Sequence, residues 1–196
     1  MKPPDHYLVQ QFQNGDKSAF DVLTERHYKR IYDYAYYQTR NVDDSYDIAQ
    51  EVFFRAFKSL HNFKGNSTFY TWIYQIARNA CVDYYRRRSS RPTLELTEEM
   101  INQESISTMR QPERRPDSIV LGKELEEQIR SAVSQLPEKQ RQVFILRHFE
   151  GLSLQEIATI MDRSLGTIKA HLHHSTRKVW KLLEPYLSDK PIRKGG

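Results

Sequence analysis

Hydrophobic side chains recur every three or four residues along most of the chain, and the strict alternation that marks β-strands is missing. Polar breaks fall at 14–16 and in the stretch 62–67, which contains Gly65. The spacing predicts helices near residues 5–13, 17–38, 43–60, 68–88, 119–134, 138–149, 153–161 and 164–184. Ser153 with Glu156 fits a capping box, and Ser164 fits the N-cap of the last helix. We therefore expect an all-α fold.

A polar segment divides these helices into two groups. Residues 92–118 hold three prolines, and six acidic side chains against three basic ones, with no sustained apolar period. Such a segment is typical of a linker. Residues 1–91 carry 14 basic and 10 acidic side chains, and residues 119–196 carry 13 and 9. We expect two small basic domains, 1–91 and 119–196, joined by the linker 92–118, which holds a short helix near 98–101.

Composition excludes several classes of protein. The 196 residues contain one cysteine, too few for a disulfide framework or a multi-cysteine zinc site. No apolar run approaches ~18 residues and the N-terminus lacks a signal-peptide core, so we expect a cytoplasmic protein without membrane insertion. No phosphate-cradling glycine loop and no nucleophile–base spacing occurs. We therefore expect neither an enzyme nor a cofactor.

The helix predicted at 43–60 has two unlike faces. One face is an apolar stripe, and the face opposite to it carries a phenylalanine, Phe54, among polar and acidic side chains. The apolar stripe comprises Ala49, Val52, Phe53, Ala56, Phe57 and Leu60, and the opposite face comprises Asp47, Gln50, Glu51, Phe54 and Lys58. One interpretation is a solvated face with a single stray aromatic. The other is a docking face for a basic, partly apolar partner.

The segment 62–91 interleaves aromatic and basic side chains. Its apolar stripe comprises Phe69, Trp72, Ile73, Ile76, Ala80 and Tyr84. Tyr74, Arg78 and Tyr85 are predicted to point away from the stripe, with Asn79 at its margin. Rings that stack bases and cations that follow phosphates suit single-stranded nucleic acid. An amphipathic helix with a basic last turn explains the same residues, and composition alone leaves both interpretations open.

The block 136–184 gives the sharpest pattern. A helix ends near Gly151, the capped helix LQEIATIM follows, and a turn at Asp162 and Arg163 leads into SLGTIKAHLHHSTRKVWKLL. Two short helices in a tight turn, the second basic outside, predict a helix-turn-helix that enters a DNA major groove. A helical hairpin without DNA contact is the less favoured interpretation.

Three histidines lie on the outer side of this last helix. His171 and His174 are one turn apart, but no carboxylate or cysteine joins them at ligand spacing. We therefore expect no metal site, and we interpret these histidines as DNA-facing polar residues.

Three stretches together resemble the extracytoplasmic-function (ECF) sigma factors of the sigma-70 family. They are DDSYDIAQEVFFRAF (43–57), FKGNSTFYTWIYQIARNACVDY (63–84) and LPEKQRQVFILRHFEGLSLQEIATIMDRSLGTIKAHL (136–172). Their order and spacing match across nearly the whole chain outside the linker. The resemblance implies a transcription initiation factor that binds core RNA polymerase, with residues 1–91 as sigma region 2 and 119–196 as sigma region 4.

The resemblance also implies roles for particular residues. The first stretch is expected to dock on the clamp helices of the polymerase β′ subunit through Asp47, Gln50, Glu51 and Phe54. The second is expected to melt and read the promoter −10 element through Phe63, Lys64, Asn66, Ser67, Thr68, Tyr74, Arg78, Asn79, Arg86 and Arg87. The third is expected to read the −35 element through Arg147, Ser164, Thr167, Lys169, Ala170, His171, His173, His174 and Arg177.

The third stretch is further expected to pack against the polymerase β flap, and an anti-sigma factor is a candidate partner. One departure stands out, because the recognition helix carries Lys169, Ala170 and histidines where the family often has arginine and serine. Fewer arginines weaken bidentate guanine reading, so we expect an unusual −35 preference. Two other functions compete: a helix-turn-helix activator with an N-terminal sensing domain, and a polymerase adaptor that reads no DNA.

Overall fold

The computed structural model describes residues 3–89 and 116–189, and within these ranges it contains eight α-helices and no strand. The all-α prediction is confirmed. The helix predicted near 98–101 lies outside the described residues. The elements are α1 (Asp5–Gln13), α2 (Ser18–Thr39), α3 (Val42–Ser59), the short 3-10 helix η1 (Leu60–Asn62), α4 (Phe69–Ser89), α5 (Pro116–Ser134), α6 (Glu138–His148), α7 (Leu154–Met161) and α8 (Leu165–Asp189).

The first unit consists of α1 to α4, and its helices begin and end where local signals place them. α2 ends at Arg40, whose φ of 58° is left-handed and stops the helix. The Asn41 side chain then accepts a hydrogen bond from the Asp44 amide at 2.9 Å and caps α3. The side chains that close the core are fully buried and come from three of the helices and η1: Leu23, Ile31, Tyr34, Ala49, Val52, Ala56, Leu60 and Ile73.

The second unit consists of α5 to α8. The predicted capping box is confirmed, because Ser153 and Glu156 satisfy each other's backbone amides at the start of α7. Ser164 likewise accepts a hydrogen bond from the Thr167 amide at 3.2 Å and begins α8. The helix-turn-helix encloses a small apolar core made of Val143, Ile145, Leu146, Ile157, Ile160 and Ile168.

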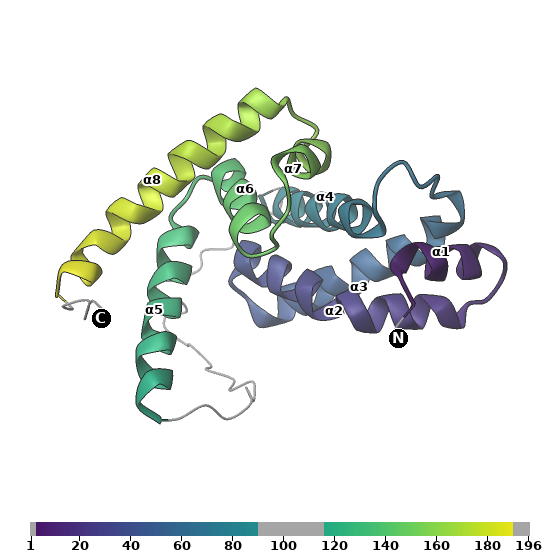
Figure 1. Ribbon diagram of the computed structural model, residues 1–196, viewed down its shortest axis with the longest axis horizontal. Coiled ribbons are helices and arrows are strands. Elements are labelled where there is room, and N and C mark those ends of the chain that lie inside the picture. Colours follow the sequence, from purple (N-terminus) through teal and green to yellow (C-terminus); the bar gives the residue numbers. More distant parts are fainter. Residues whose placement is uncertain (1–2, 90–115, 190–196) are drawn as a thin grey trace.

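The two units pack directly on one another (Figure 1). α4 lies against α7, and α2 lies against α5 and α6. In Figure 1, α6 and α7 stand between the first unit and the long α8, which extends away from it. None of the described helices combines the length and the apolar character that a membrane span requires.

Two helix ends differ from the prediction. α5 begins at Pro116, three residues before the expected start, inside the segment interpreted as the linker. α8 continues past the predicted end at residue 184 to Asp189, with Pro185 inside it. A proline removes one hydrogen bond of the helix. The turn persists because Tyr186 and Leu187 are partly buried there.

Candidate nucleic-acid and protein-docking surfaces

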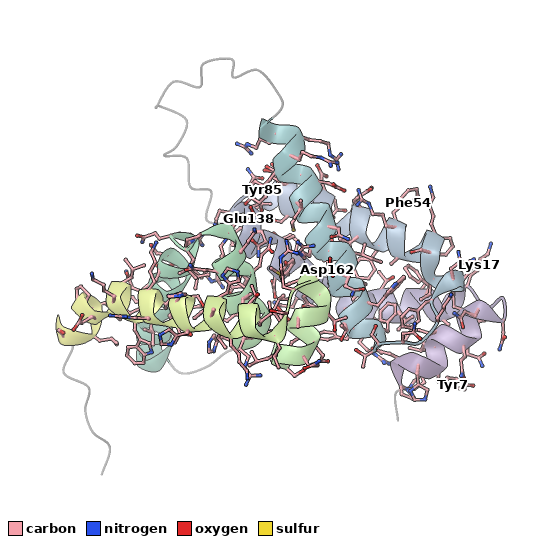
Figure 2. All side chains as sticks on the ribbon, turned by 90° about the horizontal axis from the view of Figure 1, so that it is seen from above. Tyr7, Lys17, Phe54, Tyr85, Glu138 and Asp162 are labelled. Atoms are coloured by element: carbon pink, nitrogen blue, oxygen red, sulfur yellow. The ribbon has the colours of Figure 1, made fainter. Side chains whose placement is uncertain are left out.

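The outer face of α3 is open to solvent. Asp47, Gln50 and Phe54 are exposed, and Phe54 presents 54% of its surface, more than almost any other large apolar side chain described. The Lys58 ammonium lies 4.0 Å from the centre of the Phe54 ring. Figure 2 shows Phe54 on the outer side of its helix. The structure therefore brings these three predicted docking residues together on one accessible surface.

Glu51 is held differently from the other predicted docking residues. Its carboxylate accepts a hydrogen bond from Arg55 Nε at 2.7 Å, and Arg55 Nη1 reaches Asp83 of α4 at 3.0 Å. Both acids raise the pKa of Arg55. Glu51 thus helps join α3 to α4 through Arg55. Sequence reasoning missed Tyr46, which is exposed four residues before Gln50 and eight before Phe54, a spacing that places all three on one helix face.

The loop between η1 and α4 is anchored at both ends and exposed in the middle. Gln13 of α1 donates hydrogen bonds to the carbonyls of Leu60 and Phe63, at 3.0 and 2.9 Å. The Phe63 ring lies 5.1 Å from that of Trp72. Gly65 has a φ of 72°, which a side chain would disfavour. Lys64, Asn66 and Thr68 are exposed, and Ser67 is partly so. Thr68 also caps α4, since its hydroxyl accepts from the Thr71 amide at 3.1 Å.

The exposed face of α4 carries most of the remaining residues predicted to read the −10 element. Arg78 Nη1 donates a hydrogen bond to the Asn79 side-chain oxygen at 3.1 Å, so the two side chains form one polar group. Asn79, Arg86 and Arg87 are exposed, and Arg86 also pairs with Asp83 at 3.2 Å. A positive, hydrogen-bonding strip therefore follows α4 toward its C-terminal end.

The predictions that Tyr74 and Tyr85 point away from the core are wrong. Tyr74 is completely buried and its ring meets that of Tyr34 edge-on at 5.5 Å. Tyr85 is partly buried and its hydroxyl donates to the Gln38 carbonyl of α2. The reason is that α4 contacts α2 and α3 on one side and α7 on another, so more than one apolar stripe is covered. Burial raises the pKa of Tyr74 far above its usual range.

The lone cysteine lies on this widened buried face. Cys81 is fully buried, and burial raises the pKa of its thiol to about 12. A thiol with so high a pKa is a poor nucleophile near neutral pH.

The helix-turn-helix displays the residues predicted to read the −35 element along α8. Asp162 takes a left-handed φ of 51° and reverses the chain between α7 and α8. Thr167 and His171 are partly covered. The exposed members on and before α8 are Ser164, Lys169, Ala170, His173, His174 and Arg177. In the described part of the chain, no three His, Cys, Asp or Glu side chains gather as metal ligands would.

Two arginines near the turn between α7 and α8 change the set of residues predicted from the sequence to read the −35 element. Arg147 is exposed, yet its guanidinium donates to the Leu152 carbonyl at 2.9 Å and so supports the chain before α7. Arg163 was missed, although it is exposed in the turn directly before the cap of α8. Its guanidinium donates to the Asp162 carbonyl at 2.8 Å. A cation beside an N-cap serine was the signal that could have identified it.

A second surface that sequence reasoning missed is an apolar groove formed by α5, α6 and α8. Trp180 presents 62% of its surface there. Burial and the neighbouring Arg147 both lower the pKa of His148 at its edge. The groove is lined by Leu125, Ile129, Phe144, His148, Thr176, Val179, Trp180, Leu183 and Leu187. An exposed apolar surface of this kind is typical of a protein-binding site.

Each of the two units matches the model of a known protein family. Residues 23–91 match the family model described as Sigma-70 region 2, and residues 126–179 match Sigma-70, region 4. The chain is 34% identical over 190 residues to the RNA polymerase sigma-H factor of Pseudomonas aeruginosa, with 94% of this chain and 96% of that protein covered. It is also 34% identical over 187 residues to the ECF RNA polymerase sigma-E factor of Haemophilus influenzae, with 93% and 97% covered.

A solved structure shares the fold. The sigma factor RpoE of Bartonella quintana, in complex with the anti-sigma factor NepR, superposes with a TM-score of 0.65 at 20% sequence identity. The superposition covers 84% of this chain and 96% of that protein.

Proposed function

This chain belongs to the sigma-70 family and is an RNA polymerase sigma factor of the ECF class, and on that premise we propose which of its surfaces bind polymerase and which read the promoter. It binds core RNA polymerase and directs transcription initiation at particular promoters. The observation that carries the assignment of surfaces is the exposed Phe54 among polar side chains on α3, which packs against α4 and its positive strip.

The α3 face docks on the clamp helices of the β′ subunit. Phe54 supplies an apolar anchor, and Asp47 and Gln50 beside it are exposed and ready to pair with a basic or polar partner. Aromatic anchors surrounded by polar groups are typical of the side chains that dominate binding energy at interfaces. Glu51 acts mainly by fixing Arg55 between α3 and α4, and Tyr46 extends the docking face by one turn.

The loop 63–68 and the exposed face of α4 read the −10 element as single-stranded DNA. Phe63 packs against Trp72 at the base of the loop, where a flipped base can stack on exposed ring surface. Asn79 contacts a base edge, with Arg78 fixing its orientation. Lys64, Asn66, Ser67 and Thr68 line the loop, and Arg86 and Arg87 follow the phosphates. The buried Tyr74 is left out of this set.

The exposed side of α8 reads the −35 element in the major groove. Lys169, His173, His174 and Arg177 face outward, with Arg163 at the turn next to the phosphate backbone. Because these residues include few arginines, recognition relies less on bidentate guanine contacts. Ser164 and Thr167 fix the helix start rather than read bases.

The apolar groove around Trp180 binds the β flap of polymerase. An apolar element of the flap would cover an exposed tryptophan that is otherwise unfavourable in water. An anti-sigma factor that occupied this groove or the α3 face would exclude polymerase, and such a factor is a further partner of this chain. The protein acts in the cytoplasm, together with its polymerase, and performs no bond chemistry of its own.

The test is run-off transcription with core polymerase and this protein on genomic fragments. The sigma assignment predicts discrete start sites that disappear without the protein. A helix-turn-helix activator would bind its duplex without polymerase and would leave residues 62–91 without DNA contact. An adaptor would keep promoter output when Lys169 and Arg177 are changed to alanine. Either result would overturn the proposed assignment of surfaces.

A further inference from the structure

Three arginines gather where the end of α2 meets α5 and α6, and we call Arg40, Arg130 and Arg141 the arginine cluster. Arg40 directly follows α2, Arg130 belongs to α5 and Arg141 belongs to α6. The Arg40 guanidinium donates to the Arg130 carbonyl at 2.7 Å, and Arg141 Nε donates to the Gln38 side-chain oxygen at 3.3 Å. The Arg130 guanidinium lies 5.8 Å from the centre of the Tyr37 ring. All three guanidiniums therefore converge on the last turn of α2.

The positive charge of this cluster is poorly balanced. Arg130 forms an ion pair with Glu126 of its own helix, whereas Arg40 and Arg141 donate to neutral oxygens. Among the described residues, no carboxylate forms an ion pair with Arg40 or Arg141. Glu138, the acid of α6, accepts a hydrogen bond from within its own helix. Two of the three guanidiniums thus lack a carboxylate partner in the described part of the chain.

The three charges also act on one another. Burial lowers the pKa of Arg40, and the charges of Arg130 and Arg141 lower it further, against Tyr36 and Tyr37, which raise it. Like charges in a partly buried site repel more strongly than in water, because the local dielectric constant is lower. An anion that contacts all three guanidiniums would therefore stabilise the arrangement.

Hydrogen-bond donors are in excess at the same place. Gln38 is only 1% exposed, and its side-chain nitrogen finds no acceptor among the described residues; the same holds for Arg130 Nε. Buried polar atoms without partners are rare in folded proteins. Elsewhere between the two units a donor meets a carboxylate, since the Tyr70 hydroxyl donates to Glu150 at 3.0 Å. The chemistry that complements the cluster is therefore that of an acceptor-rich anion.

Linked phosphates fit this chemistry. A guanidinium is a planar fork of donors that matches two phosphate oxygens at once and stays charged at physiological pH. Three such groups on three elements suit an anion with several charges better than a single phosphate. The Tyr36 ring, four residues before Arg40, stacks on that of Tyr32 at 6.4 Å with an interplanar angle of 10°. Both rings are partly exposed, so an aromatic base joined to the phosphates has a surface on which to stack.

We propose that the arginine cluster binds a small oligophosphate of the kind that a nucleoside triphosphate carries, with the phosphates on the three guanidiniums and the base on Tyr36. None of these residues belongs to the surfaces assigned above to polymerase or to promoter DNA. The site therefore goes beyond the proposed function and adds a small-molecule ligand to it.

The experiment measures binding to the full chain without polymerase. Sodium tripolyphosphate and adenosine triphosphate are titrated by isothermal titration calorimetry at constant ionic strength, without divalent cations. Arg40→Gln and Arg141→Gln each remove one charge from the cluster, and Arg40→Lys keeps the charge but not the fork. The matched control is Lys17→Gln, because Lys17 is exposed and precedes α2, ~33 Å from Arg40 along a helix of 22 residues. Circular dichroism checks that each variant keeps its helices.

Wild type and Lys17→Gln should bind one tripolyphosphate per chain with equal affinity. Arg40→Gln and Arg141→Gln should each lose at least ten-fold, and Arg40→Lys should lose less than Arg40→Gln. Wild type without saturable binding, full affinity in Arg40→Gln, or an equal loss in Lys17→Gln overturns the proposal. Should Arg40→Gln lose its helices, Arg40→Lys decides, since undiminished binding by that variant also overturns it.

Two further arms test the nature of the ligand. Tyr36→Ala should weaken binding of adenosine triphosphate but not of tripolyphosphate, and unchanged affinity for both overturns the placement of the base. A duplex oligonucleotide should bind Arg40→Gln as well as it binds wild type. A loss for the duplex as large as the loss for tripolyphosphate would assign the cluster to the DNA backbone and overturn the small-molecule site. Because no polymerase is present, failure of run-off transcription counts against the proposed function alone.

Discussion

Phe54 gives the sharpest quantitative expectation for polymerase binding. Its ring exposes 54% of its surface, and an aromatic side chain buries ~150–250 Å² in an interface. Covering the exposed part therefore removes about 110 Å² from water, which contributes ~2.7 kcal/mol at about 25 cal/mol per Å². Since 1.4 kcal/mol is a factor of ten, Phe54→Ala should weaken binding to core polymerase about 80-fold.

Folding should change little in this variant. The described partner of the ring is the Lys58 ammonium, 4.0 Å from its centre, and an exposed contact of this kind contributes only ~0.5–1 kcal/mol. Tyr7→Ala serves as the matched control, because Tyr7 exposes 47% of its surface on α1, outside the docking face. Affinity is measured by fluorescence anisotropy of labelled protein against core polymerase, and stability by urea denaturation. Wild-type affinity of Phe54→Ala, or an equal loss in Tyr7→Ala, would refute the reasoning.

The DNA-reading surfaces give two more expectations. Asn79→Ala should slow open-complex formation and keep most of the defect on a template pre-melted at −10, because base reading rather than melting is lost; full rescue by that template would contradict the assignment. Lys169→Ala with Arg177→Ala should reduce the slope of log affinity against log salt for promoter binding by ~2, since each cation neutralises about one phosphate; an unchanged slope would place both cations off the DNA.

Helix positions were predictable because their signals are local. Ser153, Glu156 and Ser164 satisfy amides within three residues of themselves, so their caps follow from sequence spacing alone. The outward position of Phe54 follows equally from the periodicity of α3. The error at Tyr74 has a different origin. A single stripe predicts one buried face, whereas α4 is covered on two sides, and the second side depends on packing partners elsewhere in the chain.

The contact between Tyr70 and Glu150 lay beyond sequence reasoning for the same reason. Tyr70 and Glu150 are 80 residues apart, and nothing in the pattern around either residue specifies the other. Hydroxyl and amide side chains on a helix surface are ordinary solvent-facing groups until a partner is placed opposite them. Trp180 shows a similar limit, because nothing in the pattern around it predicts that it lies exposed in the groove between α5, α6 and α8.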